Sequence, residues 1–548
     1  MRALRLVSLG LSLLVWAVAG AAAEVVSDIG ESIYLHGILG SGAPLSGVRG
    51  TDGLAVKGAD GACVNCHQHS GLGTFEGYNQ ALTIPPITGQ YLFHARGAHA
   101  DEPVLPYVEW MHGNRDPYTD LTLARAIREG VDSQGRALHF VMPHYALGDA
   151  DMAALISYLK KLDVRDVPGV TETVLHFATV ITPDTDPVKR RAMLDVMEHY
   201  FAEKNLFPIG ASAHLHTSGK TEYAKSMFMS HRLWQLHVWE LTGPASTWPA
   251  QMARLWAKEP VLAMVSGLGV SNWAPVHAFC QQQRVPCLFP NVEVPVDDGQ
   301  AFYSLYFSRG VLLEAELVAK AIDAAKASGG AITVEQIYRE GDSGAAAASA
   351  LATALKDRGI AIHSQALATG AVVPQALLRS SPASVWVLWL RAGDLGALGD
   401  AAAAPATVYV SGLMGGLEQT PIPPAWRSRV KIVYPYDLPD NRGLRLRYPL
   451  GWFSSHHIAV IDEQIQANTY LACGFLAETL SHMADNLNQP YLVELLQMSL
   501  SHRLVNTGYY PRLSLGVNQH FASRGGYIAH FADPTGTRLV ADGGWVVP

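Results

Sequence analysis

Residues 63–67 read Cys63-Val64-Asn65-Cys66-His67, a C-x-x-C-H motif. This spacing is typical of the attachment site of a c-type haem, where each thiol forms a thioether and the histidine binds the iron. Zinc knuckles and thioredoxin-like pairs also contain C-x-x-C. However, no second C-x-x-C supplies further zinc ligands, and the motif does not open a helix directly after a clear strand. The motif therefore indicates one covalent haem c.

Two amphipathic helices are expected after the motif. Asp120 can cap the first, which would end at Gly130. Asp149 can cap the second, in which apolar residues recur at helical spacing. These residues are Met152, Leu155, Ile156 and Leu159.

A loop between these helices reads Val141-Met142-Pro143-His144. A thioether from Met142 on the far side of the iron would complete a His/Met pair and close the iron to small ligands. Other side chains compete in sequence for this position, and a histidine there would give a bis-His haem. The competitors are Met111, His112, His139 and His144.

Residues 56–163 resemble class I cytochromes c. The resemblance rests on C-V-N-C-H, on I-P-P-I-T-G-Q at 84–90 and on the stretch that begins V-M-P-H-Y-A-L-G-D at 141. It implies a small all-α fold with His67 as the proximal ligand and Met142 as the distal ligand. The expected domain spans residues 24–163, including a Gly-rich lead-in.

The first 23 residues have the pattern of a secretory signal peptide. Arg2 and Arg5 precede an apolar run, and Ala21-Ala22-Ala23 offers a cleavage site. The run is short for a membrane span, but a retained anchor is the alternative. Export to the periplasm with no further membrane span is expected, and the net charge of −8 gives no basic footprint for nucleic acid.

Three cysteines lie outside the motif. Cys280 and Cys287 flank an expected helix-to-strand turn, and they either form a disulfide in an oxidising compartment or remain two buried thiols. Cys473 lies in an apolar helix and is expected to pack as a small hydrophobic residue.

Beyond a polar linker at 164–172, residues 173–548 alternate apolar strand-like runs with amphipathic helices. The first run is Val174 to Ile181, and a second such series begins near residue 331. Alternation of this kind indicates βαβ units and parallel sheets. The expected fold is therefore multidomain: an all-α unit followed by a two-lobed α/β module with a cleft.

This second part resembles type I periplasmic binding proteins of the branched-chain amino acid and amide class, most clearly at 265–295, 303–310 and 332–344. The resemblance implies two Rossmann-like lobes that close on a small ligand. The expected ligand-binding residues are Ser271, Asn272, Asn291, Glu293, Asp342 and Arg391. The Gly/Ser-rich first loop of that family is replaced by Thr182-Pro183-Asp184-Thr185, which argues against amino-acid recognition.

The sequence favours an exported electron-transfer protein over an enzyme, with a redox partner that it does not identify. The second module would bind a ligand or a partner. One alternative is a solute-binding protein of an ABC-type amino acid or amide uptake system with an accessory haem. Another is a haem oxidoreductase with an open iron site, which requires that Met142 is not a ligand.

Overall fold

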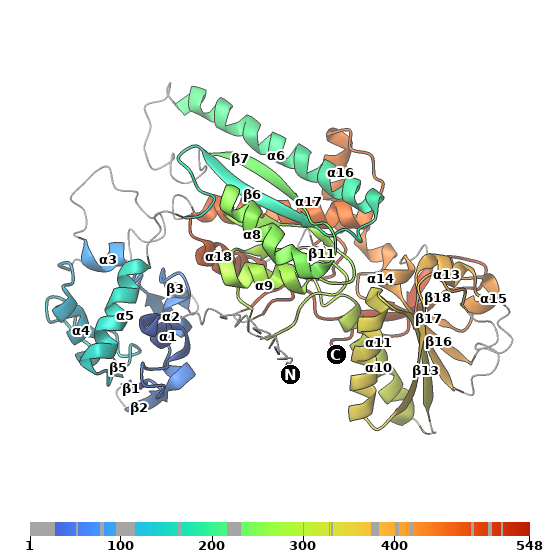
Figure 1. Cartoon of the computed structure of the whole chain (residues 1–548), viewed down its shortest axis with the longest axis horizontal. Helices are drawn as coiled ribbons and strands as arrows, with labels where there is room; N and C mark the ends of the chain where they lie inside the picture. The colour runs from blue at the N-terminus through green and yellow to red at the C-terminus, as the bar shows by residue number, and fades with distance from the viewer. Residues whose placement is uncertain are drawn as a thin grey trace, which may run out of the picture. The chain divides into compact units, whose positions relative to one another are not determined.

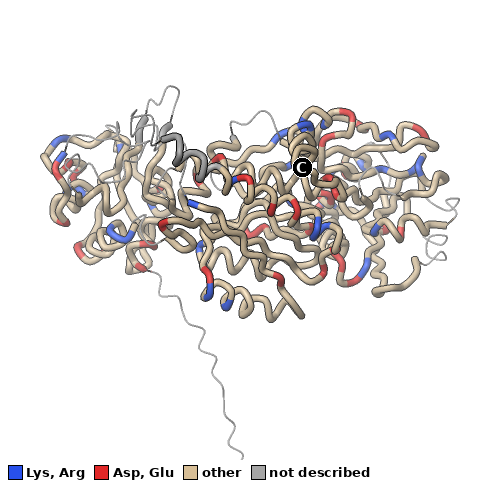
Figure 2. The backbone as a smooth tube through the Cα atoms, turned by 90° about the horizontal axis from the view of Figure 1, so that it is seen from above, with Lys and Arg blue, Asp and Glu red and all other residues tan. Residues whose placement is uncertain are grey.

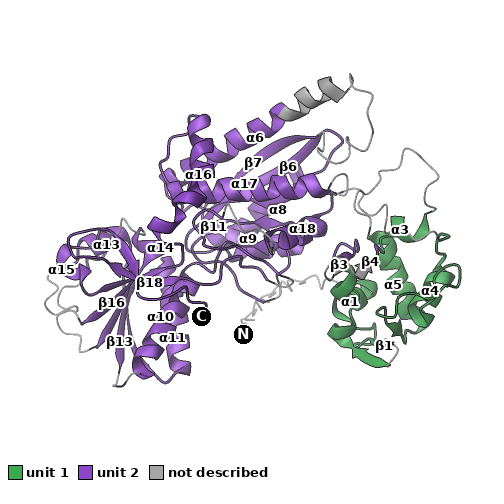
Figure 3. Cartoon of the chain, turned by 180° about the vertical axis from the view of Figure 1, so that it is seen from behind, with its two compact units in different colours: residues 1–67, 87–96, 114–162 green, residues 68–86, 97–113, 163–548 purple. Residues whose placement is uncertain are grey.

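The computed structural model describes residues 28–50, 53–76, 82–94, 115–162, 167–215, 232–299, 301–327, 329, 332–373, 383–399, 405–416, 421–483, 487–501, 507–516 and 519–548. The expected signal peptide, Met111 and His112 lie outside these residues. The chain divides into unit 1, with residues 1–67, 87–96 and 114–162, and unit 2, with residues 68–86, 97–113 and 163–548 (Figure 3). Among the described helices, none has both the length and the apolar content that crossing a membrane requires.

Unit 1 is mainly helical (Figure 1). The expectation of an all-α unit is wrong, because three short strands pair antiparallel in the order β2-β1-β5. Gly47 in β1 lies opposite Tyr145 in β5, and the missing Cβ leaves room for the tyrosine ring. The elements of this unit are α1 (Ile29–His36), β1 (Ser46–Arg49), β2 (Leu54–Lys57), η1 (Gly58–Gly61), α2 (Val64–His67), α3 (Gly89–Phe93), α4 (Asp120–Glu129), β5 (His144–Tyr145) and α5 (Asp149–Lys161).

The two expected helices of unit 1 are present with different N-caps. Thr119, and not Asp120, caps α4 through a reciprocal capping box with Thr122. Gly130 ends α4 in the left-handed conformation, as expected. Gly148 occupies the N-cap of α5, and the four apolar residues predicted for its inner face are buried.

Helices α1 and α5 approach closely at Gly30. A Cβ at this position would lie 2.2 Å from the carbonyl oxygen of Ala154 and 2.7 Å from the Cβ of Tyr158. We expect Gly30→Ala to lower the stability of unit 1 by roughly 1–3 kcal/mol, because the helices must separate. Faster amide hydrogen exchange in α1 and α5 would show this loss.

Gly443→Ala is the matched control, since Gly443 lies in α16 (Pro439–Ser455) with no atom within 4 Å of the added Cβ. This change is expected to be neutral or to stabilise by up to about 1 kcal/mol. Equal exchange in the wild type and the Gly30→Ala variant would show that the close approach does not limit the packing of α1 on α5.

The residues that directly follow the C-x-x-C-H motif belong to unit 2. The amide and the hydroxyl of Ser70 donate hydrogen bonds of 2.9 and 2.6 Å to the carboxylate of Glu494, in α18 (Gln489–Ser501). The ring of His69 stacks on that of Phe302, with 3.7 Å between centroids. This segment continues into a hairpin of β3 (Thr74–Glu76) and β4 (Leu82–Ile84).

The first lobe of unit 2 is built on a parallel sheet in the order β11-β9-β6-β8-β10-β12, with β7 also paired to β6. In β6, Phe177 faces the core on one side of the sheet, whereas Ala178 and Val180 face the core on the other side. Burial on both faces explains why this strand is a continuous apolar run. The elements are β6 (Val174–Ile181), α6 (Pro187–Leu215), β7 (Leu233–Glu240), η3 (Ala245–Thr247), α8 (Trp248–Lys258), β8 (Ala263–Val265), β9 (Leu268–Gly269), α9 (Ala274–Gln283), β10 (Cys287–Leu288), β11 (Asn291–Val292) and β12 (Ser304–Leu305).

The second lobe contains a seven-stranded sheet in the order β14-β13-β15-β16-β17-β18-β19, whose first five strands are parallel. Helices α10 and α11 pack against each other and against the sheet. The elements are α10 (Val311–Ala327), β13 (Thr333–Arg339), α11 (Ser343–Asp357), β14 (Ala361–Leu367), β15 (Val385–Trp389), α13 (Ala392–Gly396), β16 (Thr407–Ser411), α14 (Gly412–Gly415), α15 (Pro424–Arg427), β17 (Val430–Tyr434), β18 (Tyr527–Phe531) and β19 (Leu539–Ala541).

After β17 the chain forms α16, α17 (Glu463–Met483) and α18, and α17 packs on α6 and on strands of the first lobe (Figure 1). The chain then returns to the second lobe. Its terminal hairpin turns at Asp533, whose carboxylate accepts from the amides of Thr535 and Gly536.

The cysteines of unit 2 are free thiols. Cys280 and Cys287 are fully buried and stand as free thiols, and the disulfide stays a prediction. Burial, together with the neighbouring Cys287, raises the pKa of Cys280 well above its ordinary value. Cys473 packs in the apolar core, as expected.

Candidate functional site

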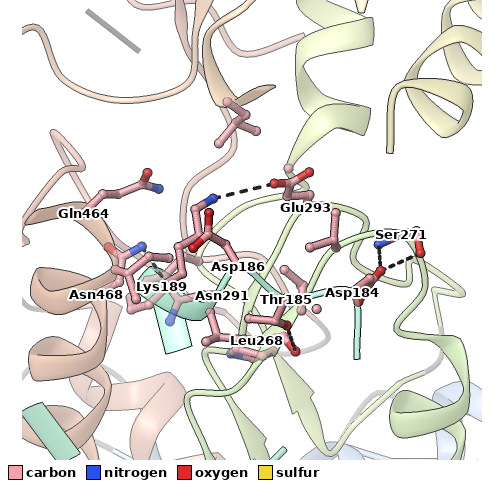
Figure 4. A pocket seen from close by; sticks show the side chains of 18 of the residues that line it. Asp184, Thr185, Asp186, Lys189, Leu268, Ser271, Asn291, Glu293, Gln464 and Asn468 are labelled. Carbon is pink, nitrogen blue, oxygen red and sulfur yellow. Dashed lines mark hydrogen bonds and ion pairs between the residues drawn. The ribbon is translucent and has the colours of Figure 1, made fainter. Parts of the chain in front are cut away.

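A cavity of about 630 Å³ lies between the two lobes of unit 2 (Figure 4). Its walls include the loops after β6 and β9 in the first lobe and the loops after β13 and β15 in the second lobe. In each sheet, strands that come later in the chain are added on both sides of the first strand, β6 or β13, so the order of addition switches sides there. The crevice at the carboxyl ends of parallel strands, at such a reversal, is the usual position of a ligand in doubly wound sheets.

The loop after β6 contributes two carboxylates. Asp184 accepts hydrogen bonds from the amide and the hydroxyl of Ser271, at 2.9 and 2.7 Å (Figure 4). It also accepts from the hydroxyl of Thr182. Burial alone would raise the pKa of Asp184, but these hydrogen bonds outweigh it and lower the pKa. Asp186 accepts from the amide of Val188 in the first turn of α6.

Arg391 joins the two lobes through a cluster of charges. Its guanidinium donates to Glu293 of the first lobe at 2.6 and 2.8 Å and to Asp342 of the second lobe at 2.9 and 2.5 Å. Ser343 donates to Glu293 at 2.7 Å. Burial alone would lower the pKa of Arg391, but the two carboxylates outweigh it and raise the pKa. Basic and acidic positions are interspersed along the described backbone (Figure 2). At Arg391, one positive and two negative side chains form a partly buried cluster.

Helix α17 supplies amide side chains to the cavity wall. Gln464 donates to the hydroxyl of Tyr436, and Asn468 donates to the side-chain oxygen of Asn291 at 3.1 Å. Asn468 is only 3% exposed, and its Oδ1 atom has no hydrogen-bond partner among the described residues. Asn468, a lining residue of the cavity, therefore carries a buried acceptor without a partner.

Glu314 lies fully buried in α10, next to the cavity wall formed by Leu413. It accepts from the hydroxyl of Ser411 at 2.5 Å and from the amide of Leu413 at 3.0 Å. Burial raises the pKa of Glu314 to about 8, although these hydrogen bonds oppose the shift. The carboxyl group is therefore protonated in the folded protein at neutral pH.

This raised pKa predicts a pH-dependent stability. Glu314 is ionised in the unfolded chain above its ordinary pKa of 4.5 but protonated in the folded chain up to about 8. We expect the free energy of unfolding to fall as pH rises between these values, by up to about 1.4 kcal/mol per pH unit. Urea titrations at pH 5, 6, 7 and 8 would measure the slope.

The Glu314→Gln variant should flatten this dependence, whereas Glu340→Gln, at an exposed position of the same lobe, should leave it unchanged. Burial also raises the pKa of Glu494 to about 7, so a smaller slope of the same sign should remain in the Glu314→Gln variant. An unchanged slope in that variant would contradict the assignment to Glu314.

Of the six predicted ligand-binding residues, Ser271, Asn291, Glu293, Asp342 and Arg391 line this cavity. Asn272 does not line it, because its side chain accepts from the amide of Ala274 at the start of α9. Sequence reasoning missed several polar lining residues. Two of them, Gln464 and Asn468, stand four residues apart on a largely apolar helix, and that spacing was a usable signal. The others are Asp186, Lys189, Tyr436 and Tyr510.

The C-x-x-C-H motif forms the short helix α2 in unit 1, with His67 only 6% exposed. Burial raises the pKa of the Cys63 thiol to about 12. Among the described residues, no group of three His, Cys, Asp or Glu side chains could hold a metal ion.

Met142 is half-buried and packs against the apolar cluster of unit 1 that Cys63 also contacts. His139 and His144, two of its rivals, are exposed. The buried imidazole, the two thiols and the thioether thus have the chemistry of a His/Met haem c donor set. The residues present fit this group.

No protein-family model matches the sequence, and no curated protein is significantly similar to it. Solved structures do match. A substrate-binding periplasmic protein from Ralstonia solanacearum is 12% identical, with a TM-score of 0.50, and the match covers 67% of this chain and 100% of that chain. A fatty acid ABC transporter substrate-binding protein from Thermomonospora curvata is 14% identical, with a TM-score of 0.48. That match covers 70% of this chain and 94% of that chain.

A third match is a branched-chain amino acid transporter substrate-binding protein from Streptococcus pneumoniae in complex with isoleucine. It is 10% identical, with a TM-score of 0.47 over 69% of this chain and 100% of that chain. At such identities the likeness concerns the fold alone. Unit 2 therefore has a two-lobed α/β fold similar to that of the substrate-binding periplasmic protein from Ralstonia solanacearum.

Proposed function

We propose that unit 2 binds a small molecule in the cavity between its lobes. The observation that carries this proposal is a cavity of about 630 Å³ lined by polar side chains from both lobes at the carboxyl ends of the two sheets. Ligand sites in proteins typically have volumes of about 300–1,000 Å³ and a few convergent polar groups. Delivery of the ligand to an ABC-type transporter is one use of such a site, and the Thermomonospora curvata protein is named for that role.

A ligand screen on the full-length protein tests this proposal. The panel contains amino acids, amines, carboxylates and sugars, and the readout is the melting temperature. A ligand present at 100 times its Kd should stabilise unit 2 by about 2.7 kcal/mol. The Asn468→Leu variant should weaken binding at least tenfold. No rise in melting temperature with any compound would contradict the proposal.

A second function, electron transfer, is favoured by the donor set in unit 1. We propose that Cys63 and Cys66 hold one haem c covalently, with His67 and Met142 as axial ligands. A bound haem would supply one-electron transfer, and the two axial side chains would exclude small molecules from the iron. The signal-peptide pattern at 1–23 supports export to the periplasm, where a redox partner would have access to unit 1.

Optical spectra of the purified protein test the axial ligands. We expect a weak far-red band from an iron–thioether bond in the oxidised wild type and its loss in the Met142→Ala variant. His139→Ala is the control and should keep the band. A high-spin wild type that binds carbon monoxide would contradict Met142 ligation and would favour a haem oxidoreductase.

A further inference from the structure

The groups in the cavity that are best suited to hold a ligand carboxylate are already occupied by the protein. The amide and the hydroxyl of Ser271, beyond the carboxyl end of β9, both donate to one oxygen of Asp184. A backbone amide beside a hydroxyl is a common anchor for anions at such strand ends. Asp184 takes the place of a ligand carboxylate, and its lowered pKa keeps it ionised.

The strongest cation in the cavity is occupied in the same way. The guanidinium of Arg391 uses its Nε and both terminal nitrogens on Glu293 and Asp342. Binding a ligand carboxylate there would require one of these bidentate pairs to break, and charge-assisted pairs of this kind are among the strongest hydrogen bonds in proteins. Arg391 is therefore not available as an anion anchor.

The cavity lining is best suited to a ligand that donates hydrogen bonds and carries a positive charge. Its lining includes four carboxylates, namely Asp184, Asp186, Glu293 and Asp342, against two cations, Lys189 and Arg391. Two negative charges are left without a compensating cation. The buried Oδ1 atom of Asn468 adds an acceptor without a partner. An ammonium group satisfies both, since it carries a positive charge and three donors.

Part of the cavity wall is apolar. Leu268, Val292, Phe307 and Ile465 line it together with the polar groups. A short hydrocarbon chain would remove apolar surface from water there. We infer that the cavity selects a small aliphatic primary amine without a free carboxylate, and not an amino acid. This inference rests on the proposed function of the cavity as a small-molecule site.

Calorimetric titration of the full-length protein with four compounds of related skeleton tests this inference. The compounds are 3-methylbutylamine, leucine, 4-methylpentanoate and 3-methylbutanol. We expect the amine to bind at least tenfold more tightly than leucine, and the acid and the alcohol to bind more weakly than the amine. Asp184→Ala frees the donors of Ser271 and removes one negative charge, so it should weaken amine binding and strengthen leucine binding, each at least tenfold.

The outcomes separate this inference from the function on which it rests. If leucine or the alcohol binds as tightly as the amine, the selectivity for amines is overturned while the cavity remains a small-molecule site. If neither these compounds nor the broad panel binds, the proposed function itself fails. Should Asp184→Ala not fold, Asn468→Leu serves in its place, and amine binding that this variant leaves unchanged would overturn the inference.

Discussion

Replacing Arg391 with alanine is expected to lower the free energy of unfolding of unit 2 by about 2–4 kcal/mol. In the wild type the guanidinium of Arg391 binds both Glu293 and Asp342. The substitution leaves these two carboxylates without their shared cation. Removing one partner of a fully buried ion pair costs about 3–5 kcal/mol, and the partial exposure of Arg391 reduces that value. Because Glu293 belongs to the first lobe and Arg391 to the second, the contact between the lobes should also loosen.

Urea denaturation measures the stability loss, and small-angle X-ray scattering measures lobe separation as a larger radius of gyration. Arg339→Ala is the matched control, since Arg339 makes a bidentate pair with Asp394 inside the second lobe and does not line the cavity. The control should lose stability without any change in radius. An Arg391→Ala variant as stable as the wild type would show that the charge cluster does not hold the lobes together.

Replacing both Cys63 and Cys66 with alanine is expected to abolish covalent haem attachment completely. Each thioether needs one of these sulfur atoms, and no other pair of cysteines in the chain has the C-x-x-C spacing. Denaturing electrophoresis with a haem stain, together with intact-mass measurement, gives the readout. The wild type should carry the mass of one haem, whereas the double variant should carry none.

The Cys280→Ala, Cys287→Ala double variant provides the control, since both thiols are buried in unit 2. It should retain the haem in full. A wild type that carries no covalent haem when expressed together with a haem-attachment system would contradict the haem proposal directly. The proposal for the cavity would be unaffected, because it rests on residues of unit 2 alone.

The parts of the fold that were predictable from sequence are those in which burial determines the pattern. Strand β6 was bounded correctly at Val174 and Ile181, because a strand covered on both faces reads as an uninterrupted apolar run. Helix α16 was missed, because Gly443 and the interior Pro449 interrupt its pattern.

The same limits apply to the cavity. Residues that directly follow strands, such as Ser271 and Asp342, were found because strand ends meet at one edge of a sheet. Asn468 was missed because it lies on a helix that returns to the first lobe only after strands β13 to β17 of the second sheet. The hydrogen bond from Ser271 to Asp184 could not be predicted from the sequence either, since it depends on how two loops 87 residues apart meet.

The return of α17 to the first lobe constrains when that lobe can fold. Helix α17 packs on α6 and on strands β8 and β11, so the first core stays incomplete until Met483 has been synthesised. Contacts of such long sequence separation slow folding and prolong the exposure of unpaired strands. The first lobe should therefore complete its core only after the five parallel strands of the second lobe have been synthesised. Truncations that end before Glu463 should leave the first lobe prone to aggregation.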